Sequence, residues 1–331
     1  MRKTNCSIAV LFMLCFSMAK AQTTLEQEIG YLLSDALFYS EKYIIPATDG
    51  AVYQASSAWM STAKKREKWT VEAGIYGNVF FVPNRDRSFT VSNSDFQFFQ
   101  IEGAESATVP TALGDNHQVY LVGDLDGEQI RFKTPQGINQ ETVVYPYLQV
   151  GVVLPYGFEV MGKYSTRTKL KKGDYQVFGF GLKHNFSQYF PSLETKKINL
   201  AAMMMYSNED ISFDFLDVNT SYGNMGINRF TGIVNTYHLQ LAASKEIKDF
   251  ELMLSFIANV SDFSYKVNGT TEEPTIFANA INDLLPELEE TKFNYVGEFS
   301  VNYFFNKFYA KGTFSFGKFA NANLGLNYII N

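Results

Sequence analysis

The sequence predicts an all-β protein, an antiparallel transmembrane β-barrel preceded by a short helical plug segment. Three observations carry this prediction. Apolar and polar residues alternate over stretches of about 10 to 14 residues, the chain begins with an export signal, and 16% of its 331 residues are aromatic. Barrel strands that cross an outer membrane need about 9–11 tilted residues, apolar toward lipid and polar toward the lumen. Strands of soluble sheets are about half as long, so a secreted β-sandwich, which also alternates, is the weaker alternative.

Residues 1–21 have the parts of a cleavable signal peptide. A basic start is followed by an apolar core from Ile8 to Met18 and by a cleavage site at Ala19-Lys20-Ala21. The apolar run is shorter than the roughly 18 residues that a membrane-spanning helix needs. We therefore expect export through the inner membrane and a mature chain that begins at Gln22.

Cleavage narrows the chemistry that the mature chain can perform. It removes both cysteines, Cys6 and Cys15, and the loss of three basic residues lowers the formal net charge from −6 to −9. Without cysteine there is no disulfide framework, zinc–thiolate site or cysteine nucleophile. An acidic chain without a basic stripe also argues against nucleic-acid binding. We expect no metal, no cofactor and no nucleic-acid partner.

The segment 22–66 is predicted to be mostly helical and to precede a barrel formed by residues 67–331. Its apolar residues recur at helical spacing, with turns expected at Pro46 and Gly50 and a basic run at its end. The spaced residues are Ile29, Leu32, Leu33, Ala36 and Leu37, and the basic run is Lys64-Lys65-Arg66.

Alternation with a period of two is clearest over 69–81, where every second residue from Trp69 to Phe81 is apolar or glycine. This period marks a strand with one apolar and one polar face. Short and long joints alternate along the chain, as periplasmic turns and outer loops do in such barrels. The expected strands lie near 69–81, 87–101, 143–154, 157–166, 175–186, 196–207, 210–217, 229–245, 249–261, 292–305, 307–317 and 319–330.

The stretch 102–142 is predicted to insert a hairpin whose place in the fold the sequence leaves open. Gln118–Gly123 and Glu128–Lys133 flank the turn residues Asp124-Leu125-Asp126-Gly127, which suit a hairpin tip. The other positions of a calcium-binding EF-hand loop do not follow. If the hairpin joins the wall the barrel has fourteen strands, which we slightly favour, and otherwise it has twelve.

The long loop 262–291 is predicted to contain an amphipathic helix over 273–290. Its apolar residues lie at helical spacing, and Pro286 is expected to end or kink the helix. These apolar residues are Ile276, Phe277, Ile281, Leu284, Leu285 and Leu288.

Catalysis has little support in the sequence, and we expect no enzyme. A membrane-embedded hydrolase would need one of His117, His184 and His238 beside a serine or aspartate. No G-x-S-x-G or H-E-x-x-H motif accompanies these histidines. A polar residue that lines the lumen is the simpler interpretation of His238.

Several short motifs carry a resemblance to a known class of outer-membrane protein. They are Pro46, the step Ser57-Ala58-Trp59 with Thr62-Ala63, and Thr134-Pro135-Gln136-Gly137. With the export signal and the helical lead-in, the chain resembles the fatty-acid-transporter (FadL-like) barrels. It resembles more closely an uncharacterised family of Bacteroidetes outer-membrane proteins. In FadL-like barrels the N-terminal segment plugs a fourteen-stranded barrel, which implies the same role for residues 22–66.

Two functions are expected for a barrel in the bacterial outer membrane, in contact with its lipids. The first is a passive transporter or pore for small hydrophobic or amphipathic molecules, with Tyr53 and Trp59 lining the ligand path. The second is an anchor or interaction platform with a closed lumen, whose loop 262–291 binds another envelope protein. A continuous tunnel past the plug would favour the transporter, and a large exposed apolar patch on the loop helix would favour the platform.

Overall fold

The computed structural model describes residues 25–214, 219–220, 223–224, 227–269 and 275–330. The predicted signal peptide 1–21 lies outside the described residues. Among the helices of this described part, none is both long and apolar enough to cross a membrane.

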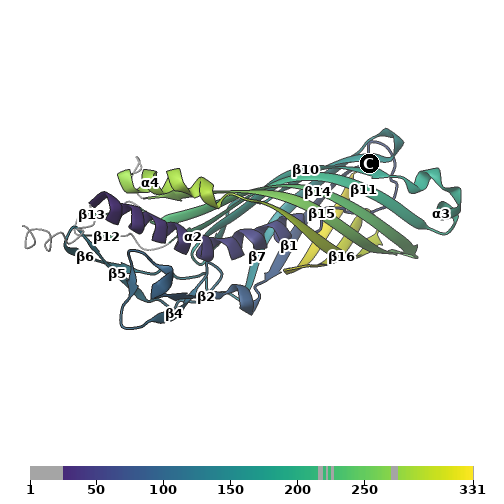
Figure 1. Ribbon diagram of the computed structural model, residues 1–331. Coiled ribbons are helices and arrows are strands. Elements are labelled where there is room, and N and C mark those ends of the chain that lie inside the picture. The colour runs from purple at the N-terminus through teal and green to yellow at the C-terminus, as the bar shows by residue number, and fades with distance from the viewer. Residues whose placement is uncertain (1–24, 215–218, 221–222, 225–226, 270–274, 331) are drawn as a thin grey trace, which may run out of the picture.

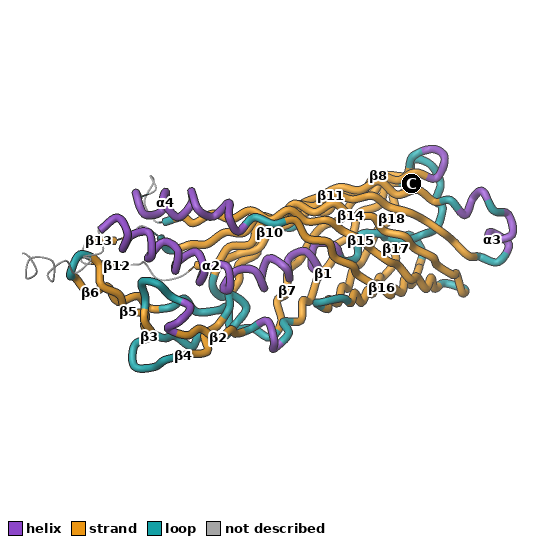
Figure 2. The backbone as a smooth tube through the Cα atoms, viewed as in Figure 1, coloured by secondary structure: helices purple, strands orange, loops and turns teal. Residues whose placement is uncertain are grey.

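Ten antiparallel strands form a closed barrel (Figures 1 and 2), which confirms the predicted fold class. Each strand pairs with both neighbours, and the pairings of β1 with β18 and of β10 with β11 complete the ring. A short strand, β9 (Thr168–Leu170), extends the pairing of β10. The wall strands are β1 (Val71–Phe81), β7 (Thr142–Val153), β8 (Phe158–Tyr164), β10 (Gly173–Asn185), β11 (Ile198–Asp214), β14 (Arg229–Ile247), β15 (Phe250–Asn268), β16 (Thr291–Phe305), β17 (Phe308–Phe316) and β18 (Ala320–Ile330).

The predicted alternation places apolar side chains outside the barrel and mostly polar ones inside it. In β15, Leu252 and Leu254 are exposed on the outer face, whereas Glu251 and Met253 are buried. Because the sheet closes on itself, no wall strand is left as an unpaired edge. The barrel therefore has a polar interior and an apolar belt.

The strand number is ten, so the predicted count of twelve to fourteen is wrong. The predicted strand 196–207 and residues 210–214 of the predicted strand 210–217 belong to one continuous strand, β11, in which Glu209 points into the polar lumen and forms no turn. Residues 215–217 lie outside the described residues. The predicted strand 87–101 lies instead in an insertion outside the wall. Polar residues that resemble a turn in the sequence are compatible with a strand wherever one face of that strand is polar.

Residues 82–141 form this insertion, which we call the outer unit. The predicted hairpin is present as β5 (Tyr120–Leu125) and β6 (Glu128–Lys133), and β5 also pairs with β3 (Gln100–Ile101). A second small sheet joins β2 (Ser88–Ser92) to β4 (Ser106–Pro110). Two short 3-10 helices, η1 (Asn84–Asp86) and η2 (Asn93–Asp95), complete the unit.

The barrel has two unlike ends (Figure 1). The turn end carries the C-terminus and short connections, including η3 (Pro155–Gly157), η4 (Ser187–Tyr189) and α3 (Pro191–Thr195). The loop end carries the outer unit, β12 (Asn219–Thr220), β13 (Gly223–Asn224), α4 (Ile276–Leu284) and η5 (Leu285–Leu288). The predicted loop helix is thus confirmed as α4, and Pro286 lies in the 3-10 turn that follows it.

The predicted N-terminal helix is confirmed as α2 (Leu25–Ser56), which begins at the loop end and enters the barrel (Figure 1). The turns expected at Pro46 and Gly50 are absent, since α2 runs through both residues. A Cβ atom at position 50 would lie 2.7 Å from the ring of Phe80. Glycine there allows the helix to approach the wall closely, and this packing outweighs the low helix propensity of the residue.

Candidate functional site

The chain crosses the barrel interior as a buried stretch, residues 47–63, which we call the lumen segment. Every residue from Ala47 to Ala63 is buried, first as the last turns of α2 and then, from Ser57, as non-helical chain. Buried backbone groups need hydrogen-bond partners. In the non-helical part these partners come from side chains of the wall.

Wall side chains bind carbonyl oxygens along the non-helical part of the lumen segment. The donors are lysine, asparagine and glutamine side chains that line the lumen. The contacts are Lys163 Nζ to Ser57 O (2.6 Å), Gln149 Nε2 to Trp59 O (2.5 Å), Lys311 Nζ to Met60 O, Asn302 Nδ2 to Ser61 O (2.9 Å), Lys183 Nζ to Thr62 O (2.9 Å) and Asn185 Nδ2 to Ala63 O (2.7 Å). The wall therefore recognises the backbone of this segment at successive residues.

Two buried glutamates bind the N–H groups of the lumen segment. The carboxylate of Glu298 accepts a hydrogen bond from Ala58 N at 2.7 Å, and that of Glu251 accepts from Ala63 N at 3.2 Å. Glu251 also accepts from the hydroxyl of Thr62 at 2.6 Å. These contacts hold both ends of the non-helical part.

His238, expected to be a polar residue lining the lumen, lies between the end of α2 and the wall. Its Nδ1 is 3.1 Å from Ser56 Oγ and its Nε2 is 2.8 Å from Ser207 Oγ. His117 is exposed, and His184 packs against Phe158 and Tyr189 near the turn end. The structure thus joins one histidine to two serines, deep in the barrel.

The two residues predicted to line a ligand path both belong to the lumen segment. The Tyr53 hydroxyl donates to Asn294 Oδ1 at 3.3 Å, and its ring packs against Phe319. Trp59 is fully buried, donates from Nε1 to Ala55 O at 2.6 Å, and lies under the Lys163 ammonium. Their role in a path stays a prediction.

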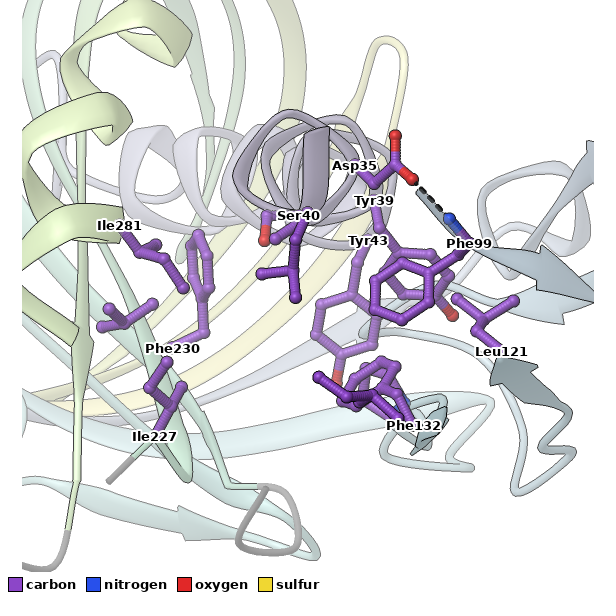
Figure 3. Close-up of a pocket in the computed structure, with 15 residues that line it drawn as sticks. Asp35, Tyr39, Ser40, Tyr43, Phe99, Leu121, Phe132, Ile227, Phe230 and Ile281 are labelled. Carbon is purple, nitrogen blue, oxygen red and sulfur yellow. Dashed lines mark hydrogen bonds between the residues drawn. The ribbon is translucent and has the colours of Figure 1, made fainter. Parts of the chain in front are cut away.

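An apolar pocket of about 110 Å³, the loop-end pocket, lies outside the lumen (Figure 3). Three regions of the chain build it: α2, the outer unit, and a third region made of Ile227, the loop-end parts of β14 and β15, and α4. The lining residues are Leu32, Asp35, Ala36, Tyr39, Ser40, Tyr43, Phe99, Leu121, Ile130, Phe132, Pro135, Ile227, Phe230, Val267 and Ile281.

Most polar groups of the loop-end pocket are already occupied. The carboxylate of Asp35 accepts backbone hydrogen bonds from Gln97, Phe98 and Phe99 at 2.8, 2.7 and 2.9 Å. The Tyr43 hydroxyl donates to Gln136 O at 2.9 Å. Burial, with smaller effects from nearby charges, raises the pKa of Tyr43 well above its ordinary value. The hydroxyl therefore stays protonated.

Tyr39 supplies a donor that the protein leaves available. Its hydroxyl lies near that of Thr134 but makes no hydrogen bond of acceptable geometry to any residue that the structure describes. Burial raises the pKa of Tyr39 well above its ordinary value, so the group remains a neutral donor. An unpaired buried hydroxyl costs free energy, and a ligand with one acceptor atom would remove that cost.

The sequence carries one signal of this pocket, which does not suffice to predict it. Leu32, Ala36, Tyr39 and Tyr43 recur at the spacing of one helix face. The residues opposite them come from segments about 60 to 250 positions away along the chain. Their meeting depends on the fold of the outer unit, which no periodicity reports.

Comparison with solved structures finds outer-membrane barrels of low similarity. The translocator domain of autotransporter NalP from Neisseria meningitidis matches at 9% identity and a TM-score of 0.36, over 85% of this chain and 95% of that one. The β domain of the Bordetella autotransporter BrkA matches at 7% identity and a TM-score of 0.36, over 80% and 100%. Ail of Yersinia pestis matches at 10% identity and a TM-score of 0.21, over 80% and 100%.

These matches are too weak to carry an argument about function, and the FadL-like and Bacteroidetes resemblances stay predictions. A search of curated proteins finds no match to the sequence. One family model covers almost the whole chain, residues 1–330. The chain belongs to this family, the family of unknown function DUF6588.

Proposed function

We propose that this protein is an outer-membrane barrel that takes up small apolar or weakly amphipathic molecules at its loop end. It passes them inward when the lumen segment moves. One observation carries the proposal. Helix α2 lines the loop-end pocket with Leu32, Tyr39 and Tyr43 and continues without a break into the lumen segment. A ligand in the pocket therefore contacts the same element that fills the barrel.

The outer surface of the barrel supports a place in a membrane. Large apolar residues are exposed on the outer face, including Ile75 (66%), Leu254 (62%) and Leu324 (73%). Such a surface suits lipid and not water. Exposed aromatic residues border this belt at both ends, as interfacial girdles do. They include Trp69, Phe250, Tyr303 and Phe308 toward the turn end, and Phe178, Phe293, Tyr295 and Phe316 toward the loop end.

The chemistry of the loop-end pocket sets the ligand class. Its lining is apolar apart from the Asp35 carboxylate, which is occupied, and three hydroxyl groups, of which Tyr39 has a free donor. A dry apolar cavity of about 150 Å³ is known to bind benzene. We therefore expect ligands of that size, with at most one hydrogen-bond acceptor.

The contacts of the lumen segment allow it to move. The wall binds it through lysine, asparagine, glutamine and glutamate side chains, and water can take over such contacts once the segment leaves. One of these wall charges also has a charged partner within the wall, since Lys183 Nζ lies 2.5 Å from Glu159. At an apolar interface water could not replace the lost contacts, and exposing that surface would cost free energy.

The closed lumen also favours a second candidate, the interaction platform. Every residue from Ala47 to Ala63 is buried, and wall side chains bind several of them, such as Ser57 through Lys163 and Ala58 through Glu298. The loop helix adds little to this candidate. Among the side chains of α4 that the structure describes, which exclude that of Phe277, Ile276 is the one large apolar side chain that is exposed (86%). Binding of an envelope protein through loop 262–291 stays a prediction.

Membrane location is tested first, by fractionation of cells and heat-modifiable gel mobility. A closed barrel in the outer membrane should migrate in that fraction and shift on boiling. A periplasmic protein with unshifted mobility would contradict the outer-membrane location and leave a secreted protein.

Transport is tested by tying the lumen segment to the wall. Ser57 Oγ and Ser315 Oγ are 2.5 Å apart, so the double variant Ser57→Cys/Ser315→Cys places two thiols within reach of a disulfide. Uptake of radiolabelled benzyl alcohol is measured in intact cells that express this variant, oxidised or reduced. The reduced form is the matched control in the same protein.

We expect the reduced variant to take up benzyl alcohol and the oxidised variant to lose that uptake while still binding it at the loop-end pocket. Equal uptake by both forms, above cells that lack the protein, would show that the segment does not gate transport. Uptake no greater than in cells that lack the protein would support the closed platform instead.

A further inference from the structure

An open groove on the turn end lies apart from the lumen and the loop-end pocket. It runs between the segment Lys65–Trp69 and the β7–β8 turn at Leu154–Gly157, and its volume is about 700 Å³. Trp69 N donates to Val153 O at 2.7 Å, which joins the two sides where the wall begins. The groove therefore lies at the rim of the apolar belt.

Two aromatic side chains of this groove are exposed and lie on strained backbone. Trp69 is 62% exposed and Tyr156 is 81% exposed. Their φ angles are +69° and +62°, in the left-handed region that bulky residues rarely adopt. Such strain persists only where the surroundings impose it, and it is concentrated at functional sites. Here Gln188 Nε2 holds the Tyr156 carbonyl at 2.7 Å.

Two lysine side chains of the groove are exposed and have no carboxylate partner among the described residues. Lys65 and Lys68 are exposed and make no ion pair within the residues that the structure describes. Arg66, between them, is bound to the buried carboxylates of Glu72 and Glu159. Arg66 thus anchors the segment from inside and leaves both lysines outside.

One carboxylate, Glu67, also lines the groove and is exposed. It offsets one of the two lysine charges and leaves the exposed groove with a net positive charge. A site of this kind suits a ligand whose anionic group is joined to an apolar part.

We propose that this groove binds the headgroup phosphate of an anionic phospholipid in the membrane leaflet at the turn end. Lys65 and Lys68 contact the phosphate, and Trp69 and Tyr156 lie where the headgroup meets the acyl chains. Tryptophan and tyrosine favour that depth, and basic residues near an anionic bilayer surface add attraction. The inference rests on the proposed membrane location.

The test uses the two tryptophans of the chain, Trp59 and Trp69. Trp59 is fully buried and provides an unquenched background, whereas Trp69 is exposed. The full mature protein is reconstituted in phosphatidylcholine vesicles that contain increasing fractions of either brominated phosphatidylglycerol or brominated phosphatidylcholine. We expect the anionic lipid to quench Trp69 at about threefold lower content than the zwitterionic lipid.

The variant Lys65→Gln/Lys68→Gln should lose this lipid preference, and Lys307→Gln should keep it. Lys307 is an exposed lysine of the same end that does not line the groove. Equal quenching by both lipids in the wild type, or a preference that survives in the double variant, would overturn the proposal while the membrane location stands. Absence of quenching by either lipid would overturn the membrane location itself.

Discussion

The carboxylate of Asp35 accepts a hydrogen bond from the backbone N–H of Phe99 at 2.9 Å, across 64 positions of the chain. The same carboxylate binds two further N–H groups of the outer unit. One buried side chain on α2 thus fastens the outer unit over the helix (Figure 3). The loop-end pocket lies at this junction.

Replacement of this carboxylate should release the outer unit. Asp35→Ala leaves three N–H groups without their acceptor, and each buried unpaired group costs about 1–3 kcal/mol. We expect faster proteolysis within residues 82–141 and loss of binding of 4-fluorobenzyl alcohol, followed by fluorine NMR. Asp124→Asn, at an exposed position of the hairpin, should change neither. Unchanged proteolysis of Asp35→Ala would contradict the role of this contact.

Removal of one hydroxyl should separate ligand binding from stability. Tyr39→Phe should weaken 4-fluorobenzyl alcohol binding by about threefold to tenfold, the value of one hydrogen bond. It should not lower the thermal unfolding temperature and should raise it slightly, because the buried hydroxyl has no well-placed partner in the described chain and its removal relieves the cost of burying it. Binding of 4-fluorotoluene, which has no hydroxyl, should be unaffected.

Tyr43→Phe is the matched control for that substitution. Its hydroxyl donates to Gln136 O, so its loss should lower the free energy of unfolding by about 1 kcal/mol and change ligand affinity little. If Tyr43→Phe reduces affinity as much as Tyr39→Phe, the free donor is not the determinant of binding.

Loss of an anchor in the lumen should loosen the closed state. Glu298 accepts from Ala58 N at 2.7 Å and from Ser315 Oγ at 2.8 Å. Hydrogen bonds to a charged group contribute about 1.5–3 kcal/mol, so Glu298→Ala should raise the ratio of open to closed barrels about tenfold or more. Conductance in planar bilayers measures this ratio. Glu289→Ala, at an exposed loop position, should conduct no more than the wild type.

A buried ion pair and an exposed one should differ in their effect on stability. Burial opposes the charge of Arg66, but Glu72 and Glu159 outweigh this effect and hold the pKa of Arg66 above its ordinary value. Arg66→Met leaves both buried carboxylates without the guanidinium that pairs with them. It should lower the free energy of unfolding by about 3–5 kcal/mol.

The comparison for this substitution is Arg131→Met. Arg131 pairs with Glu102 on the surface at 2.7 Å, and exposed pairs contribute about 0–1 kcal/mol. Thermal unfolding of both variants measures the difference. Equal losses would show that the turn-end ion pair is not a main support of the fold.

The start of α2 should be accessible from outside the cell. Helix α2 begins at the loop end, opposite the C-terminus (Figure 1), and Glu26 is exposed. On intact cells, a membrane-impermeant maleimide should label Glu26→Cys and should not label Lys307→Cys of the turn end. The mature chain has no other cysteine if residues 1–21 are removed. Labelling of Lys307→Cys alone would show the opposite orientation, with the turn end outside the cell.

Two segments, β1 and β11, show where alternation of apolar and polar residues predicts the strand correctly and where it does not. For β1, alternation of apolar and polar residues predicted both the strand and the face that lies outside. Over 196–217 the same period was present, but Asn208 and Asp210 suggested a joint where β11 continues. Polar residues can mark a turn or the polar face of a strand, and only the position of the partner strand decides between them.

The sequence alone determined the barrel class, the helical lead-in and the loop helix, because hydrophobic periodicity is a local property of the chain. The tertiary structure decided the number of wall strands, the contacts of the lumen segment and the loop-end pocket. Each of these depends on pairs such as Asp35 with Phe99 or Ala58 with Glu298, which are 64 and 240 positions apart. Closing such long loops costs entropy, which only the whole set of wall hydrogen bonds and packed side chains compensates. No local pattern therefore records which distant residues meet.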